Sequence, residues 1–341
     1  MDYIKLDNPP IFIGGLRRSG TTLLRKILGS HSQISMLPTE LNFLERIYDG
    51  KLLDNDRFVN ALERSVNHLH NKGCNLSRGK VLAELKDVER SWPNLFIAIL
   101  EAYRKNQGKQ ICGEKSPLYE FYYPILKDWF PDTGLFLIHM VRNPVDCYAS
   151  LKHRVQNGRV MNVADWCMRW NKSVGIGLRN SRLYPGHYIL LRYEDLVDNT
   201  ARICSGICQQ AGVEPEIERM LSMTDYDWQI TDNSSFLSDT EKNDSHYDGK
   251  IRKLDSVDRS KTLLYEEKSI ITLLCRPLYY AVGYEDDGNI YSISESSDEN
   301  LNLTKNLLDH LNYQEYFSRI FFGYSSERLR YYLTNRIHRS A

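Results

Sequence analysis

The chain has 341 residues, of which 42% are hydrophobic, and its 44 Lys and Arg residues balance 44 Asp and Glu residues. This size and composition allow one large α/β domain, or a domain with a small appendage. The balanced charge excludes a general electrostatic affinity for nucleic acid, although local basic clusters could still bind a small anion. The seven cysteines include no C-x-x-C pair, which is typical of a reduced, intracellular protein.

The N-terminal stretch MDYIKLDNPP is polar and lacks the pattern of a secretion signal. No apolar run approaches the roughly 18 residues that a transmembrane helix needs. We therefore expect a cytoplasmic protein without a transmembrane segment.

Strand and helix patterns alternate along most of the chain. Apolar runs at 11–16, 136–141 and 187–193 predict buried strands. Helical spacing follows at 21–30, over most of 40–107, at 144–156 and at 163–183, and Pro144 suits the first turn of its helix. The alternation predicts a three-layer α/β fold with a central parallel sheet, which binds ligands at the carboxyl ends of its strands.

The C-terminal part changes in composition. Residues 225–262 are polar and irregular, and Lys268 to Gly283 predict a closing helix. From Glu285 to Asn302 the chain is acidic and rich in Ser and Asn, which is typical of a linker. We expect a main domain at 1–285, a linker at 286–302 and a helical C-terminal extension at 303–341.

The sequence GGLRRSGTT has the glycine spacing of a nucleotide P-loop, from Gly15 to Gly20, but Thr21 stands where that loop requires lysine. The lysine serves the β- and γ-phosphates of a triphosphate, so its absence argues against an ATP or GTP enzyme. The remaining donors suit a smaller anion that is held without an obligatory metal ion; the alternative is a tight turn with no ligand. These donors are the backbone N–H groups of Ser19, Gly20, Thr21 and Thr22, the two threonine hydroxyls, and the guanidinium groups of Arg17 and Arg18.

A second anion site is predicted after the strand at 136–141. Arg142 follows this strand, and Ser150 and Arg154 share one face of the next helix by their i,i+4 spacing. Two guanidinium groups and a hydroxyl that converge in this way are suited to a phosphate dianion.

Together these motifs resemble the sulfotransferases that use 3′-phosphoadenosine 5′-phosphosulfate (PAPS). The glycine loop resembles their 5′-phosphosulfate loop, and Arg142, Ser150 and Arg154 resemble their 3′-phosphate site. The segments WCMRWNKSV, ILLRYEDLV and NSSF also recur in this family, and the resemblance spans about residues 9 to 285. Within this family, the chain is most similar to the branch of tyrosylprotein sulfotransferases and related bacterial enzymes. The resemblance implies a P-loop-NTPase-like sulfotransferase fold, PAPS as sulfate donor and adenosine 3′,5′-bisphosphate as product.

The chemistry also requires a base for the acceptor hydroxyl and a cation for the leaving oxygen. The resemblance implies a glutamate base after the loop, where Glu40 lies in PTELNF and many relatives read PETHF. Lys115, in CGEKSPLY, matches a lysine of the family, and Arg18 matches its loop arginine; we expect Glu114 to orient the loop. The alternatives are a surface salt bridge for Glu40 and a solvated lysine for Lys115.

Assignments in the later motifs stay open. Tyr193 is expected either beside the nucleotide or in the core. In LDSVDRSKTLLYEE, Ser260 and Lys261 match one version of the family's late cofactor loop, and Ser256 and Arg259 match another. His139, inside an apolar strand, is expected to be a core histidine.

The sequence therefore predicts a sulfotransferase that acts on a hydroxyl of a peptide tyrosine, a carbohydrate or a small metabolite. A P-loop kinase of a small metabolite and a non-catalytic nucleotide-binding scaffold are the alternatives. The extension at 303–341 is expected to cover the cleft, form a homodimer or dock a partner.

Overall fold

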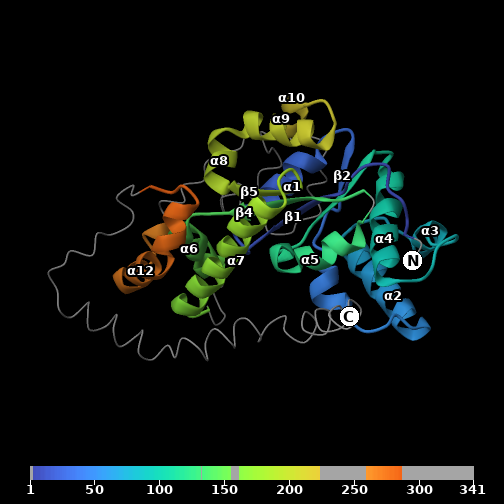
Figure 1. Ribbon diagram of the computed structural model, residues 1–341, viewed down its shortest axis with the longest axis horizontal. Helices are drawn as coiled ribbons and strands as arrows, with labels where there is room; N and C mark the ends of the chain where they lie inside the picture. The colour runs from blue at the N-terminus through green and yellow to red at the C-terminus, as the bar shows by residue number, and fades with distance from the viewer. Residues whose placement is uncertain (1–2, 132, 155–160, 223–258, 286–341) are drawn as a thin grey trace.

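The computed structural model describes residues 3–131, 133–154, 161–222 and 259–285, and its centre is a parallel sheet in the order β2-β3-β1-β4-β5 (Figure 1). Every neighbouring pair is parallel, so all carboxyl ends lie at one edge. The strands are β1 (Ile11–Gly15), β2 (Ile34–Met36), β3 (Ile111–Lys115), β4 (Phe136–Val141) and β5 (Tyr188–Arg192). This arrangement confirms the predicted α/β fold with a central parallel sheet.

Helices cover both faces of the sheet, as Figure 1 shows. Helix α1 packs on β1, β2 and β3 and also contacts α10, while α4, α5 and α7 contact strands from the other side. Because both faces are covered, a central strand such as β1 is buried over its whole length and is apolar without alternation. None of the helices in the described ranges is long and apolar enough to cross a membrane.

The helices have the following bounds. They are α1 (Thr21–Gly29), α2 (Asn55–Asn71), α3 (Arg78–Glu84), α4 (Trp92–Gln107), α5 (Tyr119–Trp129), α6 (Pro144–Arg154), α7 (Val163–Leu183), α8 (Tyr193–Asp198), α9 (Thr200–Ala211), α10 (Ile217–Ser222), α12 (Tyr265–Ala281) and the π-helix η1 (Phe43–Ile47). Buried side chains of α6, α7 and α12 form one cluster, so α12 closes the end of the fold beside β4 and β5.

The strand order creates a switch point between β1 and β4. The chain leaves β1 through α1 toward β2 and β3, whereas β4 and β5 lie on the opposite side of β1. In open parallel sheets, ligands bind in the crevice where the strand order reverses in this way. The glycine loop after β1 and Arg142 after β4 therefore lie at the place where the fold favours a ligand.

Two strands and the helices α5, α8 and α10 were not predicted from the sequence, and one helix was predicted with imprecise bounds. Strand β2 is only three residues long. Strand β3 reads ICGEK, which is fully buried but contains a glycine and two charged residues, so it gives no apolar run. The closing helix begins at Tyr265 and ends at Ala281, somewhat before the expected 268–283. The linker at 286–302 and the extension at 303–341 lie outside the described residues.

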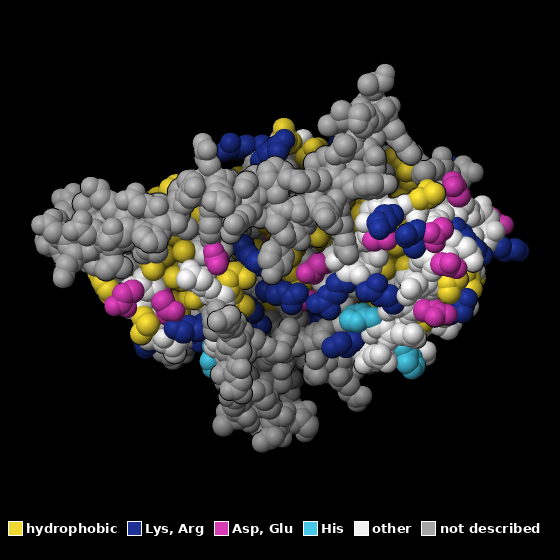
Figure 2. Space-filling model, turned by 90° about the horizontal axis from the view of Figure 1, so that it is seen from below, with side chains coloured by type: hydrophobic (Ala, Val, Ile, Leu, Met, Phe, Trp, Pro, Cys, Tyr) yellow, Lys and Arg dark blue, Asp and Glu magenta, His cyan; other side chains and the backbone are white. Residues whose placement is uncertain are grey.

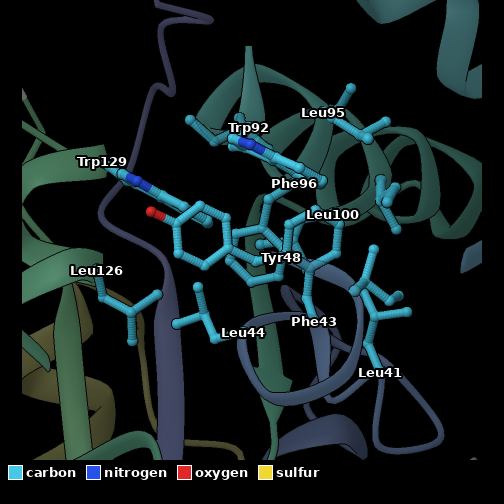
Figure 3. Close-up of a cluster of buried hydrophobic side chains, with 14 of the residues drawn as sticks. Leu41, Phe43, Leu44, Tyr48, Trp92, Leu95, Phe96, Leu100, Leu126 and Trp129 are labelled. Atoms are coloured by element: carbon cyan, nitrogen blue, oxygen red, sulfur yellow. The ribbon is translucent and has the colours of Figure 1, made fainter. Parts of the chain in front are cut away.

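An aromatic cluster anchors the segment between β2 and α2 (Figure 3). The Phe43 ring lies 5.0 Å from that of Phe96 and 6.1 Å from those of Trp92 and Trp129. Tyr48 lies 5.3 Å from Trp129 and 5.4 Å from Trp92. Ring pairs at such distances each contribute about 0.5–1.5 kcal/mol beyond their buried area. The chain that leaves β2 is therefore held firmly against α4 and α5.

Candidate active site

The loop after β1 depends on two glycines with positive φ. Gly15 has a φ of 124°, and a Cβ there would lie 2.3 Å from the carbonyl oxygen of Met140. Gly20 has a φ of 94°, and its Cβ would lie 2.4 Å from a ring carbon of Tyr193. Any side chain at either position would be strained, and it would collide with the Met140 carbonyl of β4 at Gly15 or with the Tyr193 ring at Gly20. The P-loop-like glycine spacing therefore has a direct structural cause.

The loop ends at the uncapped N-terminus of α1. Gly20 offers no side-chain cap, and the first turn, which begins at Thr21, holds no acidic residue. The free N–H groups and the helix dipole of such a terminus favour an anion. Ser19 is 2% exposed, and its hydroxyl donates to the carbonyl oxygen of Leu16 at 2.7 Å, so this side chain shapes the loop. Thr21 is buried and Thr22 is half-buried.

The structure joins the loop to the second predicted anion site. Arg18 Nε donates to Ser150 Oγ at 3.0 Å, and Arg142 Nη1 donates to the Arg18 carbonyl oxygen at 3.4 Å. Arg18 and Ser150 were predicted to bind opposite ends of a ligand, but their side chains are hydrogen-bonded to each other. Arg154, the last residue of α6, lies one turn beyond Ser150 in the same helix. The two predicted anion sites are therefore adjacent, and Arg18, Ser150 and Arg142 form a shared wall between them.

Tyr193 forms another part of this wall. The Arg142 guanidinium carbon lies 4.4 Å from the centroid of its ring, which also lies close to Gly20. Burial raises the pKa of the phenol, while the charges of Arg142 and Arg259 act in the opposite direction. Tyr193 thus contacts both parts of the site, and Arg259 comes close enough to act on it.

The positions of Ser260 and Lys261, from the late cofactor motif, do not assign a role to either residue. Ser260 is half-buried, Lys261 is exposed, and both lie just before α12. Ser256 lies outside the described residues. Arg259, from the alternative assignment, is the member of this motif whose charge reaches the site.

A buried ion pair lies at the carboxyl ends of β2 and β3. Lys115 Nζ contacts Glu40 Oε1 directly, with side-chain exposures of 0% and 17%. Lys115 ends β3 opposite Ile13 of β1, two residues before Gly15. This lysine is therefore not solvated, and it lies beside the strand that leads into the loop.

The pair sets the charge of both side chains. Burial lowers the pKa of Lys115 to about 8, although Glu40 partly opposes this. For Glu40, burial would raise the pKa, but attraction and hydrogen bonding from Lys115, with the charges of Arg17 and Arg25, lower it overall. Glu40 is consequently a carboxylate at neutral pH, and the ammonium group of Lys115 loses its proton at mildly basic pH.

Arg25 of α1 is a functional candidate that the sequence analysis missed. Its side chain is fully buried, and none of its three guanidinium nitrogens has a hydrogen-bond partner among the described residues. Its charge lowers the pKa of both Glu40 and Lys115. A single arginine within an apolar helix pattern resembles a surface residue in sequence. The available signal was its position one turn after Thr21.

Hydrogen bonds fix the segment that carries Glu40. Glu114 Oε1 accepts from Leu41 N at 2.9 Å and from Ser116 Oγ at 2.7 Å. A ring nitrogen of His68 lies 2.8 Å from the Glu40 carbonyl oxygen. Glu114 thus orients the segment that carries Glu40 and holds Glu40 beside Lys115, whereas the sequence led us to expect that it orients the glycine loop.

The balanced total charge conceals local clustering. Figure 2 shows a row of Lys and Arg side chains across the centre of one face, while Asp and Glu side chains gather mainly toward its edges. Such clusters attract small anions without a net positive charge on the whole protein. This agrees with the expectation of local basic clusters in a chain of zero net charge.

Comparisons with known proteins agree with this geometry. The chain is similar to the sulfotransferase domain of the olefin synthase from Synechococcus PCC 7002, with 24% identity and a TM-score of 0.56 over 82% of this chain and 96% of that one. It is also similar to the sulfotransferase domain from the curacin biosynthetic pathway, with 24% identity and a TM-score of 0.52 over 82% and 99% of the two chains. These likenesses show the same fold.

No curated protein matches the chain in sequence. A family model described as the sulfotransferase family matches residues 9–217, which is more than half of the chain. This range contains the glycine loop, the Glu40–Lys115 pair, Arg142 and Tyr193. The protein therefore belongs to the sulfotransferase family.

Proposed function

We propose that the protein transfers a sulfuryl group from PAPS to the hydroxyl group of an acceptor. The observation that carries this proposal is the buried ion pair between Glu40 and Lys115, beside the loop at the carboxyl edge of the sheet. The reaction needs a base for the acceptor and a cation for the leaving oxygen. The pair supplies both groups without a metal ion.

The donor has an anionic group at each end of one nucleotide, and the residues present fit both. The loop N–H groups, Arg17 and Arg18 would hold the phosphosulfate. Arg142, Ser150 and Arg154 would hold the 3′-phosphate. The fit is supported by Arg142 Nε, which is buried without a hydrogen-bond partner in the described part of the chain. We further assign Tyr193, Ser260 and Lys261 to the nucleotide, and Ser19, Gly20, Thr21 and Thr22 to the loop that receives its phosphosulfate.

The bound donor supplies a sulfonate group that is linked to phosphate through a bridging oxygen. Glu40 accepts the proton of the acceptor hydroxyl while that oxygen bonds to sulfur. Lys115 and Arg18 stabilise the charge that develops as the bond to the bridging oxygen breaks. The products are a sulfate ester, adenosine 3′,5′-bisphosphate and a protonated Glu40, which returns its proton to solvent.

These reaction steps require the ion pair to separate, because Glu40 interacts with the acceptor hydroxyl while Lys115 interacts with the bridging oxygen of the donor. A buried carboxylate that loses its cation is strongly destabilised. The guanidinium group of Arg25 has no hydrogen-bond partner among the residues that the structure describes, and its charge lowers the pKa of Glu40. Arg25 keeps Glu40 ionised when Lys115 turns toward the donor.

The pH dependence of kcat/KM is expected to be bell-shaped. Activity rises as Glu40 ionises below its ordinary pKa of 4.5, and falls as Lys115 loses its proton at about pH 8. In Arg25→Gln both limbs move to higher pH, because Arg25 lowers both pKa values. Initial rates over a pH series with subsaturating donor measure this. A wild-type profile that stays flat well beyond pH 8 would show that a protonated Lys115 is not required.

The proposed activity is tested by transfer of labelled sulfate from PAPS to peptides containing tyrosine, to carbohydrates and to phenols. We expect a labelled ester and an equal amount of adenosine 3′,5′-bisphosphate with at least one class. If no acceptor gains label but the γ-phosphate of ATP is transferred with magnesium, the protein is a kinase. If neither occurs and the nucleotide still binds, the protein is a scaffold.

A further inference from the structure

A chain of buried polar side chains lies beneath the loop, apart from the groups that carry the proposed reaction. Glu120 of α5 is 1% exposed, Ser173 of α7 is 2% exposed, and His139 of β4 is 0% exposed. Among the described residues, the only basic side chain within ion-pair distance of the Glu120 carboxyl group is His139, whose Nε2 lies 3.9 Å from Oε1. Burial lowers the pKa of His139 to about 3, so its ring is uncharged.

Glu120 holds the start of the loop. The N–H group of Gly15 donates to Glu120 Oε2 at 2.8 Å, and the N–H group of Leu118 donates to the Gly15 carbonyl oxygen at 3.2 Å. The same turn follows Lys115 at the end of β3. One hydrogen-bonded corner therefore fixes the loop and the lysine relative to each other.

The hydrogen bonds continue from Glu120 to β5. Ser173 Oγ lies 2.7 Å from Glu120 Oε1 and 3.0 Å from His139 Nε2, and the Tyr188 hydroxyl lies 2.8 Å from His139 Nδ1. A serine hydroxyl and a neutral imidazole each have a single proton to donate. The chain can therefore run in only two directions, and the direction depends on whether Glu120 carries a proton.

Each direction fixes a different tautomer of His139. If Glu120 is a carboxylate, Ser173 donates to it, so His139 must carry its proton on Nε2. If Glu120 is a carboxylic acid, it donates to Ser173, which donates to Nε2, so the ring proton is on Nδ1 and points to Tyr188. The tautomer of His139 thus reports the charge of Glu120.

Two observations favour the uncharged form. No cation neutralises Glu120 among the described residues, and a buried carboxylate without a cation beside it is far costlier than a buried acid. The loop that Glu120 supports must also receive an anion, which a negative charge below Gly15 would repel. We propose that Glu120 is a positioning residue that holds the loop as an uncharged carboxylic acid, at one end of the hydrogen-bonded chain to β5. This inference rests on the proposed function, because it assigns Glu120 to the donor loop.

Kinetics test the positioning role. Glu120→Gln keeps an acceptor for Gly15 and a donor for Ser173, so the KM for PAPS should stay within about twofold of the wild-type value. Glu120→Met removes both and should raise that KM by about tenfold or more, with the acceptor KM unchanged. Glu101→Met is the control, since Glu101 is a buried carboxyl group paired with Arg104 on α4, away from the loop. Equal KM values in Glu120→Met and the wild type would overturn the positioning role.

The charge of Glu120 is tested without donor or acceptor. Nitrogen-15 NMR of the full-length protein labelled in histidine distinguishes the two tautomers, and the His139 signal is identified by its loss in His139→Gln. We expect the Nδ1–H tautomer in both the wild type and Glu120→Gln. An Nε2–H tautomer in the wild type would overturn the uncharged acid. If the protein proves not to bind PAPS, the NMR result still decides the state of Glu120, so failure of the proposed function remains distinguishable.

Discussion

Replacing Glu40 by glutamine is expected to lower kcat by roughly 10² to 10⁴-fold, the usual contribution of a general base. The amide cannot take the proton of the acceptor hydroxyl, but it keeps the size of the side chain and a contact with Lys115. Binding of adenosine 3′,5′-bisphosphate should be unchanged, because Glu40 does not hold the nucleotide. Steady-state kinetics with saturating PAPS, together with calorimetric binding, measure the two quantities separately.

The matched control for this change is Glu63→Gln. Glu63 is on the surface of α2, with a half-exposed side chain paired with Arg78, so the same substitution there should leave kcat unaltered. Wild-type kcat in Glu40→Gln would exclude Glu40 as the base. Parallel loss of kcat and nucleotide affinity would instead indicate a disturbed fold.

Replacing Lys115 by methionine is expected to lower kcat by roughly 10² to 10³-fold, because a cation aimed at developing charge is lost. It also leaves Glu40 without its buried partner, which costs about 3–5 kcal/mol of stability when a buried pair is broken on one side. Rapid-quench measurement of sulfate transfer and thermal unfolding measure these effects.

A double variant separates the two effects of Lys115. Glu40→Gln with Lys115→Met removes both charges, so it should recover much of the lost stability but none of the activity. Lys105→Met is the control, since Lys105 forms an exposed ion pair with Glu84. Near-normal transfer by Lys115→Met would mean that Arg18 and the loop suffice for the leaving oxygen.

The sequence was sufficient for features that are local in the chain. The glycine spacing from Gly15 to Gly20 predicted the loop, because the positive φ values and the close neighbours allow only glycine there. The apolar runs predicted β1, β4 and β5, since a buried parallel strand needs no alternation. The glycine loop and Arg142 were expected just past the carboxyl ends of two strands, and the structure has them after β1 and β4.

The features that could not be predicted from the sequence depend on contacts between residues that are far apart in the chain. Strand β3 is a strand because β1 and β2 pair with it, although ICGEK contains two charged residues. The contact of Arg18 with Ser150 spans 132 positions, and that of Gly15 with Glu120 spans 105. Local patterns contain no information about such partners. Arg25 was missed for the same reason, since only the folded structure shows that it is buried without a partner.

The proposed function requires one nucleotide site, formed by the loop after β1 and by the turn after β4. Calorimetric titration with adenosine 3′,5′-bisphosphate, compared with ATP and magnesium, tests it most directly in the wild type and in Arg142→Ala with Ser150→Ala. We predict clear binding of the bisphosphate by the wild type, weaker binding of ATP, and a loss of about a hundredfold or more in the double variant, since hydrogen bonds to charged groups each contribute about 1.5–3 kcal/mol. No binding by the wild type, or undiminished affinity in the double variant, would contradict the account.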